Sequence, residues 1–193
     1  MIWTVLVPLK PPGERKTRLA GVLSIDQCDA LADQLFRHVT SVLRQTPIIG
    51  RMILLSAQPT IGGAIEWICD KGEGLNEALE VARVTLGTVP LIVLHPDLPL
   101  LNVMDITMLA DAGLGGCAIA PDRHGTGTNA IALAPGHVFR FAFGAASLAA
   151  HRAQGSHALV DREGLVLDLD TPEDLAALRA RRVAHPIAQR YSV

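Results

Sequence analysis

Cysteine and aromatic residues are scarce in this chain, and long apolar runs are missing. Three of the 193 residues are cysteines, and 4% are aromatic. Cys28, Cys69 and Cys117 are far apart and fit no metal-ligand spacing, so we expect reduced, buried thiols and no disulfide framework. No stretch approaches the about 20 apolar residues that cross a bilayer. Lys10 also interrupts the first apolar stretch too early for a signal peptide.

The chain lacks a marked excess of either charge. Its formal net charge of -2 argues against a protein that holds nucleic acid by bulk electrostatics. The content of 49% hydrophobic and 19% charged residues is typical of a globular domain. We therefore expect one cytoplasmic domain over residues 1–193, with residues 183–193 as a C-terminal tail and neither a membrane nor nucleic acid as partner.

Short apolar stretches alternate with amphipathic ones. Strands are expected at residues 2–7, 51–56, 91–94 and 117–120, with a short one near 64–69. Helices are expected at about 25–44, 75–86, 102–112, 144–151 and from 172 onward. The succession of strand, helix and strand predicts an α/β fold around a mainly parallel sheet.

The stretch 89–101 provides the first candidate site. Residues 91–94 are wholly apolar, as in a strand buried on both faces, and Pro96 and Pro99 cannot continue a central ladder. Asp97 is thus placed just beyond the carboxyl end of a central strand, where ligands bind in open α/β sheets. It could hold a divalent cation or merely cap the loop.

Two loops before this strand are candidates for phosphate binding. The loop after the first strand carries the cations Lys10, Arg15, Lys16 and Arg18, which could grip a polyphosphate or only aid solubility; the spacing of a P-loop is absent. Gly72 and Gly74 precede a helix, where backbone amides favour anions. Asn76 could bind a base or ribose there, or only close the helix end.

Small donors collect later in the chain. In the loop 121–129, Thr126, Thr128 and the amides of glycines 125 and 127 could bind phosphate or carboxylate oxygens, while Asp122 and Arg123 could orient one another. Ser147, three residues after Gly144, is expected in the first turn of a helix and near its amides.

Two further carboxylates follow in an expected strand. Alternation over residues 164–170 places Asp168 and Asp170 on one face. Their repulsion favours a bound cation. Pro172, Glu173 and Asp174 then form a good helix start.

These motifs together resemble the 2-phospho-L-lactate guanylyltransferase family (CofC, also called FbiD) of coenzyme F420 biosynthesis. The resemblance extends from about Val5 to Leu178, and its most specific segments are 122–129 and 168–174. It implies a three-layer α/β/α nucleotide-diphospho-sugar transferase fold, similar to MobA-like nucleotidyltransferases. It also implies transfer of GMP from GTP to a small phosphorylated acid with release of pyrophosphate. The acceptors associated with the family are 2-phospho-L-lactate, phosphoenolpyruvate and 3-phospho-D-glycerate.

The resemblance also implies roles for particular residues. Asp97 would bind Mg²⁺ together with Asp168 or Asp170. The implied catalytic residues are Lys16, Arg18 and Asp97; the implied nucleotide-binding residues are Lys10, Lys16, Arg18, Gly74 and Asn76; the implied acceptor-binding residues are Thr126 or Thr128, Gly144 and Ser147. The loop departs from the family pattern at residues 12–15, before Lys16.

Two other functions fit the same residues. A nucleotide-sugar glycosyltransferase would share the fold and the aspartate but release a nucleoside diphosphate. A non-catalytic nucleotide-binding subunit would bind GTP without consuming it, although the intact acidic residues argue against this. A homodimer is common for such domains and stays open.

Overall fold

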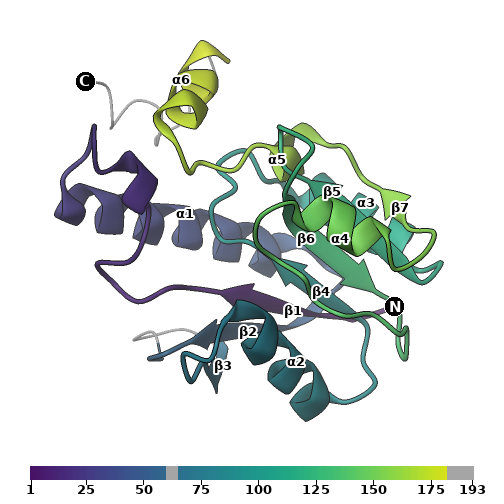
Figure 1. Ribbon diagram of the computed structural model, residues 1–193. Helices are drawn as coiled ribbons and strands as arrows, with labels where there is room; N and C mark the ends of the chain where they lie inside the picture. Colours follow the sequence, from purple (N-terminus) through teal and green to yellow (C-terminus); the bar gives the residue numbers. More distant parts are fainter. Residues whose placement is uncertain (60–64, 182–193) are drawn as a thin grey trace.

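A seven-stranded sheet forms the centre of the computed structural model, which describes residues 1–59 and 65–181 (Figure 1). The spatial order of the strands is β3-β2-β1-β4-β6-β5-β7. The strands are β1 (Trp3–Pro8), β2 (Ile49–Ser56), β3 (Glu66–Cys69), β4 (Leu91–Leu94), β5 (Cys117–Pro121), β6 (Thr128–Leu133) and β7 (Ala158–Leu159).

The sheet is mostly parallel, as predicted, with one reversed strand. β3, β2, β1 and β4 pair in parallel, whereas β6 runs antiparallel to both β4 and β5. Leu94 at the end of β4 pairs with Ala130, near the start of β6. The reversal therefore brings Thr128 and Asn129 to the edge at which the parallel strands end, beside the segment that carries Asp97.

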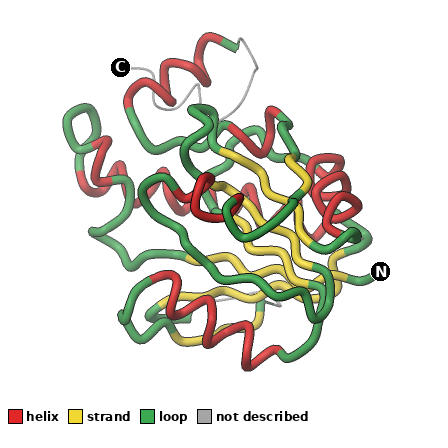
Figure 2. Tube along the Cα trace, turned by 45° about the vertical axis from the view of Figure 1, so that its right-hand side comes forward, coloured by secondary structure: helices red, strands yellow, loops and turns green. Residues whose placement is uncertain are grey.

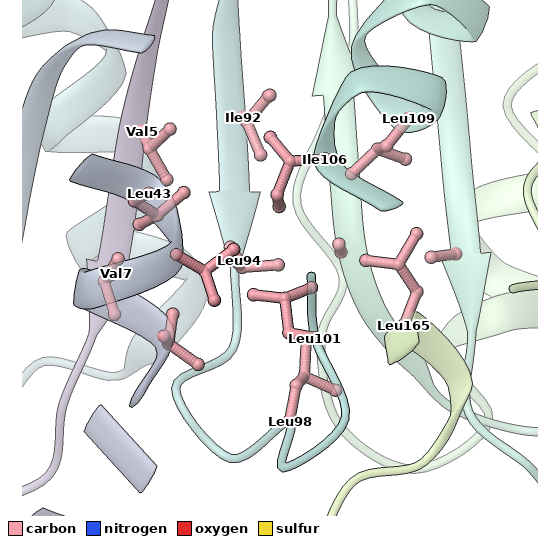
Figure 3. Close-up of a cluster of buried hydrophobic side chains, with 14 of the residues drawn as sticks. Val5, Val7, Leu43, Ile92, Leu94, Leu98, Leu101, Ile106, Leu109 and Leu165 are labelled. Atoms are coloured by element: carbon pink, nitrogen blue, oxygen red, sulfur yellow. The ribbon is translucent and has the colours of Figure 1, made fainter. Parts of the chain in front are cut away.

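Helices cover both faces of the sheet and make three layers (Figures 1 and 2). α1 (Ile25–Gln45), α3 (Val103–Gly113) and α5 (Glu163–Val166) share one buried cluster with β1 and β4. Figure 3 shows this cluster, in which Leu43 of α1 and Ile106 of α3 meet side chains of β1 and β4. α2 (Leu75–Leu86) and α4 (Ser147–Arg152) share the cluster on the opposite face. The predicted α/β fold is confirmed.

The segment 164–170 differs from the predicted strand. It begins as the short helix α5 and continues as irregular chain over residues 167–170. The alternation survives in burial, since Leu167 and Leu169 are buried while Asp168 and Asp170 are partly exposed. The strand does not form because this segment joins no ladder: Leu169 N–H donates to the carbonyl of Asp97, at 3.0 Å.

α6 (Pro172–Ala180) packs on the N-terminal half of α1, away from the sheet (Figure 1). Leu175 and Leu178 of α6 join a third buried cluster with Leu31 and Leu35 of α1. The predicted tail, residues 183–193, lies outside the described residues. Within the described ones, no helix is long and apolar enough to cross a membrane.

The cysteine prediction holds at two of the three positions. Cys28 and Cys117 are buried free thiols, whereas Cys69 is exposed. Cys69 ends β3, the strand at the outer edge of the sheet, where only one neighbouring strand covers it.

Candidate active site

The cationic loop between β1 and α1 is anchored by acidic residues of α1. Asp29 accepts hydrogen bonds from the N–H of Gly13, and Asp33 pairs with Arg15 at 2.6 Å. Lys16 then adopts the left-handed backbone conformation, with φ of 53°, directly before the 3-10 turn η1 (Thr17–Leu19). A non-glycine residue in this conformation is strained, and it persists only where the surrounding contacts enforce it. Here the turn directs Lys16 inward.

Lys16 bridges two of the predicted metal-binding carboxylates. Its Nζ lies 2.7 Å from Asp97 Oδ2 and 3.0 Å from Asp170 Oδ1. Arg18 is more distant from Asp170, at 3.6 Å, and 73% of its side chain is exposed. The structure thus brings together Lys16, Asp97 and Asp170, with Arg18 at the solvent side.

Electrostatics keep Lys16 and Asp97 ionised. Burial alone would lower the pKa of Lys16, but the charges of Asp97 and Asp170 outweigh it and raise that pKa. Burial alone would likewise raise the pKa of Asp97, but Lys16 outweighs it and holds that pKa below its usual range. An ammonium between two carboxylates therefore rests where a metal cation would also be stable.

Asp97 retains one oxygen free for a ligand. Its Oδ1 is buried and has no hydrogen-bond partner among the described residues. The adjacent His95 is buried, packs against Phe143 with ring centroids 5.1 Å apart, and its Nε2 also lacks a partner there. Burial lowers the pKa of His95, which keeps the imidazole neutral. Unsatisfied buried polar atoms are rare and often mark ligand sites.

Asp168 is tied to the start of β6 by Asn129. The Asn129 amide donates to Asp168 Oδ1 at 3.3 Å and to the carbonyls of Leu165 and Val166. Burial, together with the negative charge of Asp97, raises the pKa of Asp168 to about 6. Because its pKa is raised, the Asp168 carboxylate is readily protonated, and a nearby cation would stabilise its charged form. Within residues 1–59 and 65–181, the three aspartates do not gather as a group within 4.8 Å.

Asp174 fixes the position of Asp170. Its Oδ2 accepts hydrogen bonds from the backbone N–H groups of Asp170 and Thr171 and from the Thr171 hydroxyl, at 2.7 to 3.0 Å. Its other oxygen pairs with Arg123. The prediction that Asp122 and Arg123 orient one another is therefore wrong, because the helix start of α6 offers Arg123 a buried carboxylate.

Asp122 instead shapes its own loop. It accepts from the Thr126 N–H at 2.8 Å and from the Thr126 hydroxyl at 3.3 Å. A Cβ on Gly127 would come to 2.8 Å from the Asp122 carboxylate, so a larger residue here would push that side chain aside. The hydroxyl of Thr126 is exposed and serves the turn.

The hydroxyl of Thr128 belongs to a buried hydrogen-bond chain. Thr128 Oγ1 lies 3.0 Å from His151 Nδ1, and His151 Nε2 accepts from the Ala142 N–H at 2.9 Å. Because Nε2 is an acceptor, the ring proton is assigned to Nδ1, which donates to Thr128. Burial lowers the pKa of His151 to about 4, so the ring is neutral. The Thr128 proton is then free to be donated elsewhere.

The remaining predicted acceptor residues lie on the same side as Thr128. Leu148 N–H, in the first turn of α4, donates to the Thr126 carbonyl at 3.1 Å. Ser147 is buried, and its N–H donates to the Gly144 carbonyl at 3.2 Å. Gly144 has a φ of 127°, which favours glycine. The hydrogen bond from Leu148 to Thr126 joins the 121–129 loop to the helix start that follows the turn 144–147.

Asn76 and Gly74 lie at the start of α2. Both polar atoms of the Asn76 side chain bond to the backbone of Phe143, at 2.7 and 3.0 Å. Asn76 thus closes the gap between α2 and the segment that leads to Gly144. Its contact with a nucleotide stays a prediction, as does that of the exposed Lys10, whose carbonyl accepts from Arg15.

Sequence reasoning missed three residues that organise the site. Asn129 and Asp174 lie inside the recognised motifs but have no predicted role in the site, and His151 is not among the predicted site residues. A polar residue next to an expected ligand in a specific motif was the available signal for Asn129. No local signal connects His151 to Thr128, because the contact depends on how α4 packs.

The sheet and its helices have the arrangement found in solved nucleotide-transferring proteins. A protein described as a nucleotide-diphospho-sugar transferase, from Desulfovibrio desulfuricans G20, has a similar structure, with a TM-score of 0.76 and 16% identity, covering 98% of this chain and 94% of its own. The structure of 4-diphosphocytidyl-2C-methyl-D-erythritol synthase is also similar, with a TM-score of 0.60 and 13% identity over 93% of this chain and 97% of its own. These likenesses concern the fold.

The chain belongs to the CofC-like guanylyl transferase family, which matches residues 3–180. Phosphoenolpyruvate guanylyltransferase from Sphaerobacter thermophilus is 37% identical, over 92% of this chain and 93% of its own. The protein of the same name from Thermobaculum terrenum is 34% identical, over 93% of this chain and 85% of its own. The predicted family, fold and enzyme class are therefore confirmed.

Proposed function

We propose that the enzyme transfers GMP from GTP to phosphoenolpyruvate and releases pyrophosphate, in coenzyme F420 biosynthesis. The names of the relatives support this acceptor. The observation that carries the proposal is the bridge from Lys16 to Asp97 and Asp170, at the edge where the parallel strands end. This edge joins cations for a triphosphate to carboxylates for a metal, within one domain.

The reaction needs positioning more than proton transfer. An oxygen of the acceptor phosphate attacks the α-phosphorus of GTP, and the bond from that phosphorus to the bridging oxygen of pyrophosphate breaks. The attacking phosphate is already anionic, so no general base is required. Catalysis then depends on aligning the two phosphates and neutralising their charge.

The acidic residues fit a divalent cation, which we propose is Mg²⁺. The donor set is all carboxylate oxygen, the preference of a hard cation. The free Oδ1 of Asp97 and the raised pKa of Asp168 both favour an added positive charge. Asp97 and Asp170 would hold the ion, with Asp168 beside them; bound there, it would neutralise charge on the phosphates.

The cations would serve the triphosphate. Lys16 rests on two carboxylates, and phosphate oxygens offer it a competing anionic partner when GTP binds. Arg18 is exposed and within reach of the same edge, and Lys10 lies on the same loop. Gly74 and Asn76 would border the nucleoside at the start of α2.

The acceptor would bind on the β6 side. Thr128 can donate its proton to an acceptor oxygen because His151 already donates to the threonine oxygen. Ser147 and Gly144 would contribute the hydroxyl and the backbone of the neighbouring turn. Of the two threonines left open by the sequence, we propose Thr128 as the acceptor contact, since Thr126 is held by Asp122.

An assay of three acceptors tests this function. Purified enzyme, GTP and Mg²⁺ are incubated separately with phosphoenolpyruvate, 2-phospho-L-lactate and 3-phospho-D-glycerate, and both pyrophosphate and GDP are measured. We expect pyrophosphate with phosphoenolpyruvate and no GDP. Release of GDP would indicate phosphoryl transfer or hydrolysis of GTP instead. If only one of the other two acids supports pyrophosphate release, that acid is the acceptor in place of phosphoenolpyruvate.

A further inference from the structure

A second cluster of metal-ligating side chains lies at the end of β5 and β6 that is far from the candidate active site. Cys117 begins β5, His137 follows β6, and His157 directly precedes β7. Cys117 pairs with Leu133 at the far end of β6 from Thr128. Five residue-to-residue steps along the strand, about 16 Å, separate that end of β6 from Thr128 in the proposed acceptor site. The cluster is therefore separate from the carboxylates of the active site.

The three side chains converge closely. One ligand atom from each lies within 4.8 Å of the other two. The ring centroids of His137 and His157 are 6.1 Å apart, and the rings meet edge to face. Cys117 is buried and forms no disulfide. These atoms come from three separate segments, so sequence spacing gives no sign of the group.

The environment of His157 gives independent support for a ligand at this cluster. Both of its ring nitrogens are buried and have no hydrogen-bond partner among the described residues. A neutral imidazole has one N–H donor and one acceptor, and leaving both unsatisfied in the interior is costly. Buried polar groups of this kind call for an explanation such as an ion or a water. The neighbours of His157 include Phe139, which offers only a ring.

We propose that Cys117, His137 and His157 bind one transition-metal ion of the zinc class. The ligands would be the Cys117 thiolate and one ring nitrogen from each histidine, and a water would complete the tetrahedron. Sulfur and imidazole nitrogen select such metals over Mg²⁺, whereas the oxygen ligands around Asp97 have the reverse preference. The two sites would therefore bind different metals.

The geometry requires only small side-chain movements. Zinc bonds of about 2.0 to 2.3 Å place tetrahedral ligand atoms roughly 3.5 Å apart. The three atoms, within 4.8 Å of one another, would have to close by about 1 Å. Two of the ligands lie outside the strands, on loop residues that can make this adjustment. Burial raises the pKa of the Cys117 thiol to about 12, so binding must displace its proton.

The metal would crosslink the segments around β7, the strand at the outer side of β5. β7 consists of two residues and pairs with β5 at only two positions. A bond from His157 to a metal on Cys117 would fix the chain entering β7, and His137 would fix the turn leaving β6. The consequence is greater stability, without a direct part in the reaction.

Cobalt titration of the full chain tests the proposal. Co²⁺ replaces Zn²⁺ in tetrahedral sites, and a thiolate ligand gives an intense charge-transfer band that carboxylates do not. We expect this band to appear at one Co²⁺ per chain and to be displaced by Zn²⁺. Zn²⁺ at about 100 times its Kd is expected to raise the Tm by roughly 5 to 10 °C.

Matched variants assign the band. Cys117→Ala should abolish it, and His137→Ala or His157→Ala should weaken binding at least about 10-fold. Cys69→Ala, His124→Ala and, for a buried thiol elsewhere, Cys28→Ala should leave it unchanged. The histidine variants decide the matter if Cys117→Ala fails to fold. No band in the wild type, a band lost with Cys69, or a band indifferent to both histidine variants would overturn the proposal.

Discussion

The ammonium of Lys16 lies 2.7 Å from Asp97 although 81 positions separate the two residues. This contact joins the first loop of the chain to the end of the central strand. Lys16 is 7% exposed and Asp97 15%, so each charge depends on the other for its stability in the interior. The cationic loop and the carboxylates beyond β4 therefore form one unit before any substrate binds.

Replacing Lys16 by methionine tests that unit. Lys16→Met should lower kcat about 100- to 1000-fold, because a charge facing the phosphates is lost. It should also tighten the binding of Mg²⁺ in the absence of GTP, since the competing ammonium is gone. Steady-state rates and calorimetric Mg²⁺ titration measure the two effects. Lys71→Met, at an exposed lysine, is the matched control; weaker Mg²⁺ binding in Lys16→Met would refute the competition.

Neutralising each aspartate in turn identifies the metal ligands. Asp97→Asn should reduce pyrophosphate release at least about 1000-fold with an unchanged circular dichroism spectrum. Asp170→Asn should raise the Mg²⁺ concentration required for half-maximal rate more than Asp168→Asn does, because Asp170 already shares a cation with Asp97. Asp111→Asn, on the surface of α3, controls for lost charge. Normal turnover in Asp97→Asn would exclude it from the metal site.

The two threonines of the polar loop are expected to differ. Thr128→Val should raise the KM for phosphoenolpyruvate about 10-fold and leave the KM for GTP unchanged, because one hydrogen bond to an anionic acceptor is lost. Thr126→Val should have a smaller effect, since its hydroxyl bonds to Asp122 in an exposed turn. Initial-rate kinetics of the two variants measure the difference. Equal KM values for both would remove Thr128 from the acceptor site.

The sequence predicts most of the residues that the structure gathers at the candidate site, because they follow strand ends and helix starts. Asp97 after a buried strand, with Asp168 or Asp170 before a helix as its partner, could be predicted from the chain alone. Their connection through Lys16 could not, since it depends on a left-handed residue held by α1. The strand predicted over 164–170 failed because periodicity records which side chains are buried, and not whether a neighbouring ladder exists.

Long-range contacts were the other limit. The donation of the Asn129 amide to the carbonyls of Leu165 and Val166 crosses 36 and 37 positions. The contact of Thr128 with His151 crosses 23 positions. Nothing in the local pattern around His151, Leu165 or Val166 points to these partners. Such pairs are fixed only when the helices pack on the sheet.

His151 makes stability sensitive to acid. Its pKa is about 4 in the folded protein against 6.5 for an ordinary histidine, so the unfolded chain binds the proton more tightly. The stabilisation is complete above pH 6.5 and is lost as the pH falls toward 4, by about 3 kcal/mol in total. His95 adds to the same trend. Denaturant unfolding at several pH values measures the slope.

The His151→Gln variant separates the contribution of His151 from that of His95. Glutamine can both accept from Ala142 and donate to Thr128, but it does not titrate. The variant should lose less stability on acidification than the wild type, whereas the exposed His124→Gln should behave like the wild type. Identical pH slopes in His151→Gln and the wild type would contradict the buried neutral imidazole.

The most direct test of the account is the identity of the product formed from GTP and phosphoenolpyruvate. Mass spectrometry and phosphorus NMR should show phosphoenolpyruvate joined to GMP through a diphosphate, with one pyrophosphate released for each product molecule. The Asp97→Asn enzyme should give none. GTP that stays intact with all three phosphorylated acids, or that yields GDP, would contradict guanylyl transfer at this site.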